Sequence, residues 1–136
     1  MARRQSKVWV NGTFDVLHIG HIKLLQFANI KGKVRVGIDY DDRVRQLKGV
    51  SRPINVWEDR KYFLKSIRYV DSVVGFGSDE ELEEKIKQYQ PDYMIVGSDY
   101  KDKKVIGSQY AKELLFFERI KNFSTTNILN NKNFTK

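Results

Sequence analysis

The stretch over residues 7–30 restricts the fold most, because its apolar side chains change from a strand pattern to a helix pattern across one short loop. Val8–Val10 belong to a short apolar run, which predicts a buried strand. Ile22 and the apolar residues after it recur at helical spacing, which predicts a helix over residues 18–30. A strand that leads directly into a helix is typical of a parallel α/β sheet. The loop between them is therefore expected at the carboxyl ends of the strands, where such sheets bind ligands.

The same alternation continues along the chain. Four more strands are expected at residues 34–38, 72–76, 92–96 and 113–118. The helices expected besides the first are a short one over residues 43–47, two with Asn55 and Ser78 as N-caps, a short one following residues 106–109, and one starting near Ser124. Five strands that alternate with helices predict a single α/β domain with a Rossmann-like, doubly wound, five-stranded parallel sheet.

The length of 136 residues is that of one domain. We expect a basic arm over residues 1–6, one domain over residues 7–129 and a polar tail over residues 130–136. The chain has no cysteine, which excludes disulfides and thiol chemistry. No apolar run approaches the ~20 residues that span a membrane, and residues 1–6 lack the apolar core of a secretory signal. We therefore expect a cytoplasmic protein with no membrane partner.

The formal net charge of +8 makes the surface basic. A basic surface suits nucleic acids, but it suits small polyanionic substrates equally well. Lysines and arginines are spread along the chain rather than gathered in blocks, and most aromatic residues lie in apolar runs. We therefore expect no nucleic-acid partner.

The loop between the first strand and the first helix carries groups suited to phosphate. Gly12 has no Cβ, so the backbone can approach an anion closely, and N–H groups at the helix N-terminus point toward negative charge. His18 and His21, the only histidines, are three residues apart, so on a helix they share one face and can donate hydrogen bonds to phosphoryl oxygens. They could instead be half of a metal site, but no cysteine and no nearby third ligand supports zinc.

Several common catalytic patterns are missing from the sequence. It has no Gly-x4-Gly-Lys-Ser/Thr, no Gly-x-Gly-x-x-Gly and no Gly-x-Ser-x-Gly. These absences disfavour P-loop kinases and ATPases, dinucleotide oxidoreductases and hydrolases with a nucleophilic serine. Transfer between two phosphates, by positioning and charge stabilisation, remains the best interpretation of the loop.

Gly12–Asp15, followed by His18–His21, resembles the opening of the cytidylyltransferase-like nucleotidyltransferase superfamily. The resemblance implies that a phosphate oxygen of an acceptor attacks the α-phosphorus of a nucleoside triphosphate and that pyrophosphate leaves. It also implies a homodimer. Mg²⁺ is the expected cofactor, held mainly by phosphate oxygens rather than by a metal site of the protein.

The resemblance also implies a role for each part of the site. The catalytic residues would be His18, His21, Lys48 and Arg119. The nucleotide-binding residues would be Gly12, Thr13, Phe14, Gly20, Gly97, Asp99, Ser124, Thr125 and Thr126. The substrate-binding residues would be Asp15, Asp41, Arg52 and Arg60.

Two branches of the superfamily remain open. Leu47–Gly49 followed by Arg52–Asn55 is similar to a segment of the heptose-1-phosphate adenylyltransferase domain, which favours ATP and a sugar 1-phosphate. Residues 58–61 and 67–71 are shared with glycerol-3-phosphate cytidylyltransferases, which lack the Arg-Pro-x-Asn element. Asn122 stands where those enzymes have glycine. The sugar-kinase domain of the bifunctional heptose enzymes is not present in the sequence.

Structural explanations compete with several of these roles. Arg60 could pair with the nearby Asp59 or Glu58, and Asp41 could cap a helix instead of contacting ribose or metal. A non-catalytic module that binds nucleotide also remains possible. The presence of both histidines, together with Lys48 and Arg119, argues against such a loss of chemistry.

Overall fold

The structure is a computed structural model that describes residues 6–118. Its strands are β1 (Lys7–Gly12), β2 (Lys33–Asp39), β3 (Ser72–Phe76), β4 (Tyr93–Gly97) and β5 (Glu113–Phe117). Its helices are α2 (Ile19–Lys31), α3 (Asp41–Lys48), α4 (Trp57–Lys65) and α5 (Asp79–Tyr89), with 3₁₀ turns η1 (Ser98–Tyr100) and η2 (Ser108–Tyr110). All five predicted strands are present within two residues of the expected bounds.

The strands form one parallel sheet in the order β3-β2-β1-β4-β5. This confirms the predicted doubly wound α/β fold. The chain moves from β1 outward to β3 and then returns to the far side of β1 for β4, so β1 and β4 flank the point where the strand order reverses. Ligands of open α/β sheets bind beside that point, outside the carboxyl ends of the strands.

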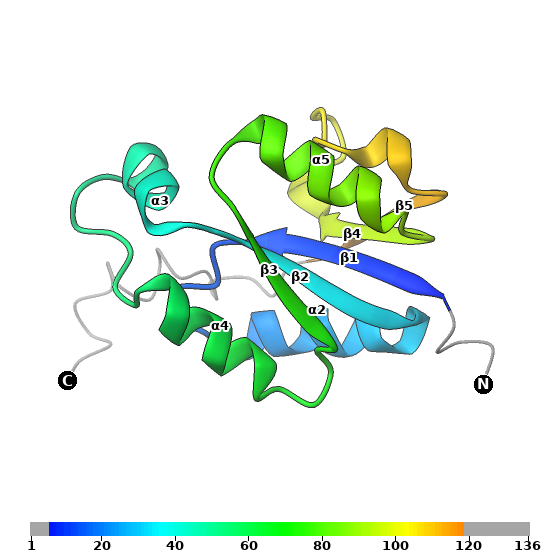
Figure 1. Ribbon diagram of the computed structural model, residues 1–136. Coiled ribbons are helices and arrows are strands. Elements are labelled where there is room, and N and C mark those ends of the chain that lie inside the picture. Colours follow the sequence, from blue (N-terminus) through cyan, green and yellow to red (C-terminus); the bar gives the residue numbers. More distant parts are fainter. Residues whose placement is uncertain (1–5, 119–136) are drawn as a thin grey trace.

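Helices cover both faces of the sheet (Figure 1), with α2 and α4 on one face and α5 on the other. Alternation along β1 sends Val8 and Val10 into the core under α2 and α4, and Trp9 into the core under α5. Trp9 needs Gly37 beside it on β2, because a Cβ at residue 37 would lie 2.5 Å from the Trp9 ring. Within residues 6–118, side chains therefore pack against both faces of the sheet, and a ligand is expected at the ends of the strands.

Two aspartates fix the strands at their amino ends. Asp92 precedes β4; its carboxylate accepts a hydrogen bond from the Lys7 backbone N–H at 2.8 Å, and its own N–H donates to the Lys7 carbonyl. Asp71 precedes β3 and makes the same pair of bonds with Val34. These reciprocal bonds join β1 to β4 and β2 to β3 at the edge of the sheet opposite the carboxyl ends.

The N-cap of α4 differs from the sequence prediction. Val56, not Asn55, is the N-cap of α4, and it makes no side-chain cap hydrogen bond. Asn55 is used instead to hold the loop before the helix, as described below. The Ser78 cap is confirmed, because its hydroxyl accepts a hydrogen bond from the Glu81 N–H. The helix expected near Ser124 lies outside the described residues.

Candidate active site

A cavity of about 590 Å³ opens at the carboxyl ends of the strands. Residues from the ends of all five strands line it: Gly12, Asp39, Phe76, Gly97 and Phe117. Connections between strands and helices supply the rest of its wall. The cavity therefore lies at the edge of the sheet that the sequence pattern predicted for a ligand.

Most of the predicted site residues that the structure describes line this cavity. They are Gly12, Thr13, Phe14, His18, Gly20, His21, Lys48, Arg52, Gly97 and Asp99. Three predicted substrate ligands, Asp15, Asp41 and Arg60, are not among the lining residues. Arg119, Ser124, Thr125 and Thr126 lie outside the described part of the chain, so their roles stay predictions.

The two histidines form the N-terminal cap of α2. His18 is the N-cap rather than the first helical residue, and its Nδ1 accepts a hydrogen bond from the Gly20 N–H at 3.1 Å. His21 Nδ1 accepts one from the His18 N–H at the same distance, and the ring centroids are 3.9 Å apart. Since each Nδ1 is an acceptor, the proton of each neutral ring resides on Nε2. The cap therefore makes both rings Nε2–H donors beside the cavity.

The loop between β1 and α2 holds a strained backbone. Phe14 has φ of +50°, which is uncommon for a residue with a side chain, and its ring is buried 5.1 Å from the His21 ring. A Cβ at Gly12 would lie 3.1 Å from the Phe14 ring, so glycine permits this packing. Phe14 thus holds the loop and the His21 ring together.

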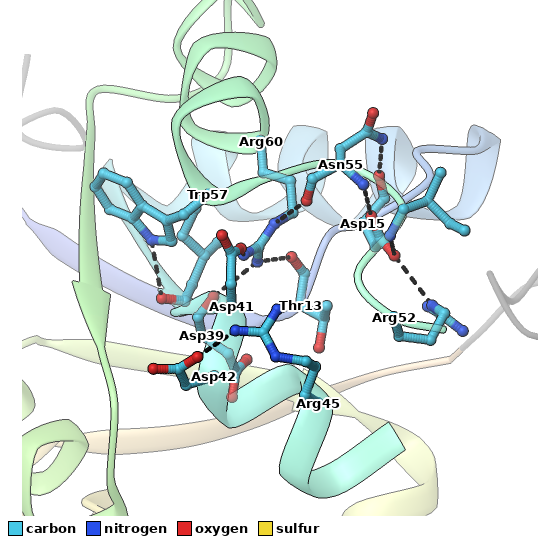
Figure 2. A network of polar contacts seen from close by, with 12 residues as sticks. Thr13, Asp15, Asp39, Asp41, Asp42, Arg45, Arg52, Asn55, Trp57 and Arg60 are labelled. Atoms are coloured by element: carbon cyan, nitrogen blue, oxygen red, sulfur yellow. Dashed lines mark hydrogen bonds and ion pairs between the residues drawn. The ribbon is translucent and has the colours of Figure 1, made fainter. Parts of the chain in front are cut away.

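Asp15 is buried and holds the loop over residues 52–55 (Figure 2). Its carboxylate accepts hydrogen bonds from Arg52 Nε at 3.0 Å, from the Ile54 N–H at 2.7 Å and from the Asn55 N–H at 2.8 Å. The Asn55 side chain donates in turn to the Asp15 carbonyl at 2.6 Å. Asp15 was predicted to contact substrate; in the structure its carboxylate accepts these hydrogen bonds from Arg52 and the loop.

Arg60 is fully buried and joins three segments at the same edge of the sheet (Figure 2). Its guanidinium donates to the carbonyl oxygens of Asn55, Thr13 and Asp39 and to the Asp41 carboxylate, at 2.7–3.1 Å. Its ionic partner is therefore Asp41, not a neighbour on α4. The direct contact with substrate phosphate that the sequence predicted would require the guanidinium to leave these acceptors. Arg60 and Asp41 instead hold the loops that line the cavity.

Asp41 also differs from the alternative considered from sequence. It is the first residue of α3, whose N-cap is Tyr40. Its carboxylate accepts from Arg60 Nη2 at 2.7 Å. Asp41 therefore contributes to the site through Arg60 rather than as a helix cap.

Arg43 lines the cavity, and sequence analysis did not single it out. Its Nε lies 2.9 Å from Asp39 Oδ2, and its Nη2 lies 2.6 Å from Asp79 Oδ1. Partial burial acts to lower the pKa of Arg43, but the hydrogen bonds to Asp79 and Asp39 outweigh it and raise the pKa. The i,i+4 spacing from Asp39 was the one available signal in the sequence, since Asp79 is remote along the chain.

The donor chemistry of the cavity suits phosphate better than a bare metal ion. Imidazole, lysine and arginine groups are prominent among its polar lining residues, including His18, Lys48 and Arg52. Over residues 6–118, no group of three or more His, Cys, Asp or Glu side chains is arranged to hold a metal ion. In the same part of the chain, no helix is long and apolar enough to cross a membrane.

Comparisons with known proteins agree with this architecture. The cytidylyltransferase-like family model matches residues 9–131. The bifunctional protein HldE of Sulfurimonas denitrificans is 46% identical over 120 residues, which cover 88% of this chain and 25% of that protein. The HldE protein of Campylobacter fetus is 42% identical, with 93% and 28% covered. The chain thus spans about a quarter of the length of these curated relatives.

A solved structure shows the same fold. The lipopolysaccharide core biosynthesis protein from Thermoplasma volcanium superposes with a TM-score of 0.68 at 22% identity, covering 83% of this chain and 97% of that one. Its likeness concerns the fold, whereas the family match covers the loop and histidines that shape the cavity. On this evidence, the chain belongs to the cytidylyltransferase-like family.

Proposed function

We propose that this chain is a nucleotidyltransferase that transfers a nucleoside monophosphate, with ATP preferred, to a sugar 1-phosphate such as heptose 1-phosphate. The observation that carries the proposal is the double histidine cap. It directs two Nε2–H donors to a cavity at the carboxyl ends of the sheet, beside the N-terminus of α2. The similarity to HldE proteins adds support.

The reaction would be a displacement at phosphorus. An oxygen of the acceptor phosphate attacks the α-phosphorus, the bond from that phosphorus to the bridging oxygen breaks, and its electron pair leaves with pyrophosphate. His18 and His21 would donate to oxygens that gain charge in the transition state. Lys48, which also lines the cavity, would neutralise the α-phosphate and the attacking phosphate.

The triphosphate would be held chiefly by backbone and hydroxyl groups. Within the described residues, this cradle would be formed by the N–H groups of Gly12–Phe14 and of the first turn of α2. Arg119 and residues 124–126 are proposed to bind the β- and γ-phosphates. Mg²⁺ is proposed to arrive with the nucleotide and to neutralise charge on its phosphates.

The choice of acceptor rests on the loop between α3 and α4. This loop contains the Arg52–Asn55 element that resembles the heptose branch, and Asp15 and Arg60 both hold it. A glycerol-3-phosphate cytidylyltransferase is the alternative, since residues 58–61 suit it equally well. A non-catalytic nucleotide-binding module is the second alternative.

The experiment measures pyrophosphate release with Mg²⁺, crossing ATP and CTP with heptose 1-phosphate and glycerol 3-phosphate. Release only with ATP and the sugar 1-phosphate is expected. Release only with CTP and glycerol 3-phosphate would move the protein to the other branch. Tight nucleotide binding without release in any combination would support the non-catalytic module.

A further inference from the structure

We propose that Asp15 is a positioning residue that aims the Arg52 guanidinium at the phosphate group of the acceptor. The inference rests on the proposed transferase function. It assigns binding of the acceptor phosphate to Arg52, which Asp15 holds in place. It differs from the expectation that Asp15 itself contacts substrate, because the Asp15 carboxylate already accepts three hydrogen bonds from the protein.

Arg52 is held by a rigid support. The Asp15 side chain is fully buried, and its bonds reach Arg52, Ile54 and Asn55 within one short segment. The Asn55 amide returns a bond to the Asp15 carbonyl. The segment that carries Arg52 is therefore bound to the loop between β1 and α2. The Arg52 side chain cannot change its orientation without breaking the ion pair with Asp15.

One donor group of Arg52 is not used within the described residues. Asp15 engages Nε of Arg52, while Nη2 is buried and has no hydrogen-bond partner among the described residues. Arg52 is 9% exposed and lines the cavity. A buried charged donor without an acceptor is unfavourable. We therefore expect the ligand to supply an anionic acceptor for Nη2. A planar guanidinium whose Nε edge is already fixed presents its Nη groups in a set direction, which suits a phosphate oxygen.

The donor groups of the cavity come from two different connections of the chain. The histidine cap and the Gly12–Phe14 backbone belong to the connection between β1 and α2. Arg52 belongs to the connection between α3 and α4, which begins just after Lys48. Two connections thus bring separate donor groups to one cavity, and a transferase must hold two phosphorylated molecules. We assign the first group to the nucleotide and Arg52 to the acceptor.

The test compares Asp15→Asn, Arg52→Gln, Arg52→Lys and the double variant D15N/R52Q in steady-state pyrophosphate release. Asp15→Asn and Arg52→Gln are each expected to raise the KM for heptose 1-phosphate at least about tenfold, the equivalent of one charged hydrogen bond. The KM for ATP and kcat are expected to change little. Because Asp15 acts through Arg52, the double variant is expected to lose no more than Arg52→Gln alone.

Arg52→Lys keeps the positive charge and the Asp15 carboxylate, but one ammonium cannot both pair with Asp15 and reach the ligand. It is expected to behave like Arg52→Gln. Even if Asp15→Asn fails to fold, this variant tests whether the Arg52 guanidinium binds the acceptor phosphate. The matched control is Asp42→Asn, which breaks an exposed aspartate–arginine pair with Arg45 on α3 and is expected to leave both KM values unchanged.

The outcomes separate the inference from the proposed function. An unchanged acceptor KM in Arg52→Lys, a rise confined to the KM for ATP, or additive losses in the double variant would overturn the inference while leaving the transferase intact. If the wild-type chain releases no pyrophosphate, calorimetry with inorganic phosphate still tests the aimed guanidinium. Equal phosphate affinity in the wild type and Arg52→Lys would then reject it, and a loss of about tenfold would support it.

Discussion

The two histidines act both as helix cap and as candidate catalytic donors. Each Nδ1 closes the N-terminus of α2, and that same bond leaves the proton on Nε2. The spacing of His18 and His21 in the sequence predicted that they act together. It could not predict the tautomer, because that depends on the helix starting one residue later than the pattern indicated. The first turn of the helix therefore sets the tautomer of the two proposed donors.

The two roles of His18 can be separated by substitution. Asparagine is a good N-cap but does not place a donor at the Nε2 position, so His18→Asn is expected to keep the stability within about 0.5 kcal/mol and to lower kcat ~10²–10³-fold. His18→Ala is expected to lower kcat similarly and also to lose about 1 kcal/mol of stability. Urea unfolding and pyrophosphate release measure the two effects. Full activity in His18→Asn would rule out the donor role.

The hydrogen-bond partners of Arg60 could not be predicted from the sequence. Its position near the start of α4 suggested a partner one or two residues away. In the structure its acceptors are on segments around Thr13, Asp39 and Asn55, together with Asp41. Only the fold brings these segments together, so the sequence, which predicted substrate or a neighbouring acid as the partner of Arg60, could not indicate these acceptors.

Replacing Arg60 by lysine tests this network. Lysine keeps the charge but cannot reach all four acceptors, so Arg60→Lys is expected to lower the free energy of unfolding by about 2–4 kcal/mol, measured in urea. Arg45→Lys, at a half-exposed position on α3, is the control and should stay within about 0.5 kcal/mol. A stability loss no greater than that of the control would show that the bonds of Arg60 contribute little.

At the scale of elements, the strands are fixed at one end and open at the other. Asp71 and Asp92 bind the backbone of the neighbouring strand at the amino ends, whereas the carboxyl ends surround the cavity. Strand positions were predictable from apolar runs. The reciprocal bonds were not, because an aspartate before a strand is also common in turns. The bonds require the register of β1 with β4 and of β2 with β3.

Asp92 makes this end of the sheet sensitive to acid. The Lys7 backbone N–H, followed by the Lys112 ammonium, lowers the pKa of Asp92 below its ordinary value of 3.8. The carboxylate therefore contributes stability above pH ~4, and this contribution is lost as pH falls through the lowered pKa. Urea midpoints measured from pH 7 to pH 2 should show Asp92→Asn less stable than the wild type at pH 7. The difference should shrink in acid.

A matched control accompanies this series. Asp102 is exposed in the loop after η1, so Asp102→Asn removes the same charge without touching the sheet. Its difference from the wild type should stay near zero throughout. A constant deficit of Asp92→Asn down to pH 2 would indicate that packing, rather than the carboxylate charge, fixes β1 against β4.

At the scale of the whole molecule, the cavity depends on every strand of the sheet. The alternation of strands and helices was sufficient to predict the fold and the edge of the sheet at which the cavity opens. The side chains that line the cavity were harder to predict. Asp15, Asp41 and Arg60 hold loops instead of lining the cavity, whereas Arg43 lines it. The sequence does not show whether the polar side chain of a loop residue faces the cavity or is buried against a neighbouring loop.

Since the five strand ends meet at one cavity, a nucleotide bound there should stabilise the entire domain. A ligand at 100 times its Kd adds about 2.7 kcal/mol to the free energy of unfolding. We expect Mg²⁺·ATP to raise Tm more than AMP, because AMP lacks the phosphates that the α2 N-terminus is proposed to bind. Differential scanning calorimetry measures the shift. Equal shifts with ATP and AMP would contradict that assignment of the triphosphate.

The homodimer stays a prediction at this scale. Light scattering would distinguish the 16.0 kDa chain from a species of twice that mass. The dependence of the mass on protein concentration would then give the dimer affinity.

The position of Lys7 has a practical consequence. β1 starts at Lys7, at the edge of the sheet where Asp92 binds it, and it ends at Gly12 beside the cavity, so Lys7 lies at the edge opposite the cavity. An affinity handle, a surface anchor or a second enzyme attached there would leave the cavity mouth clear. The fold thus offers a tethering point at which immobilised protein keeps its ligand site facing the solution.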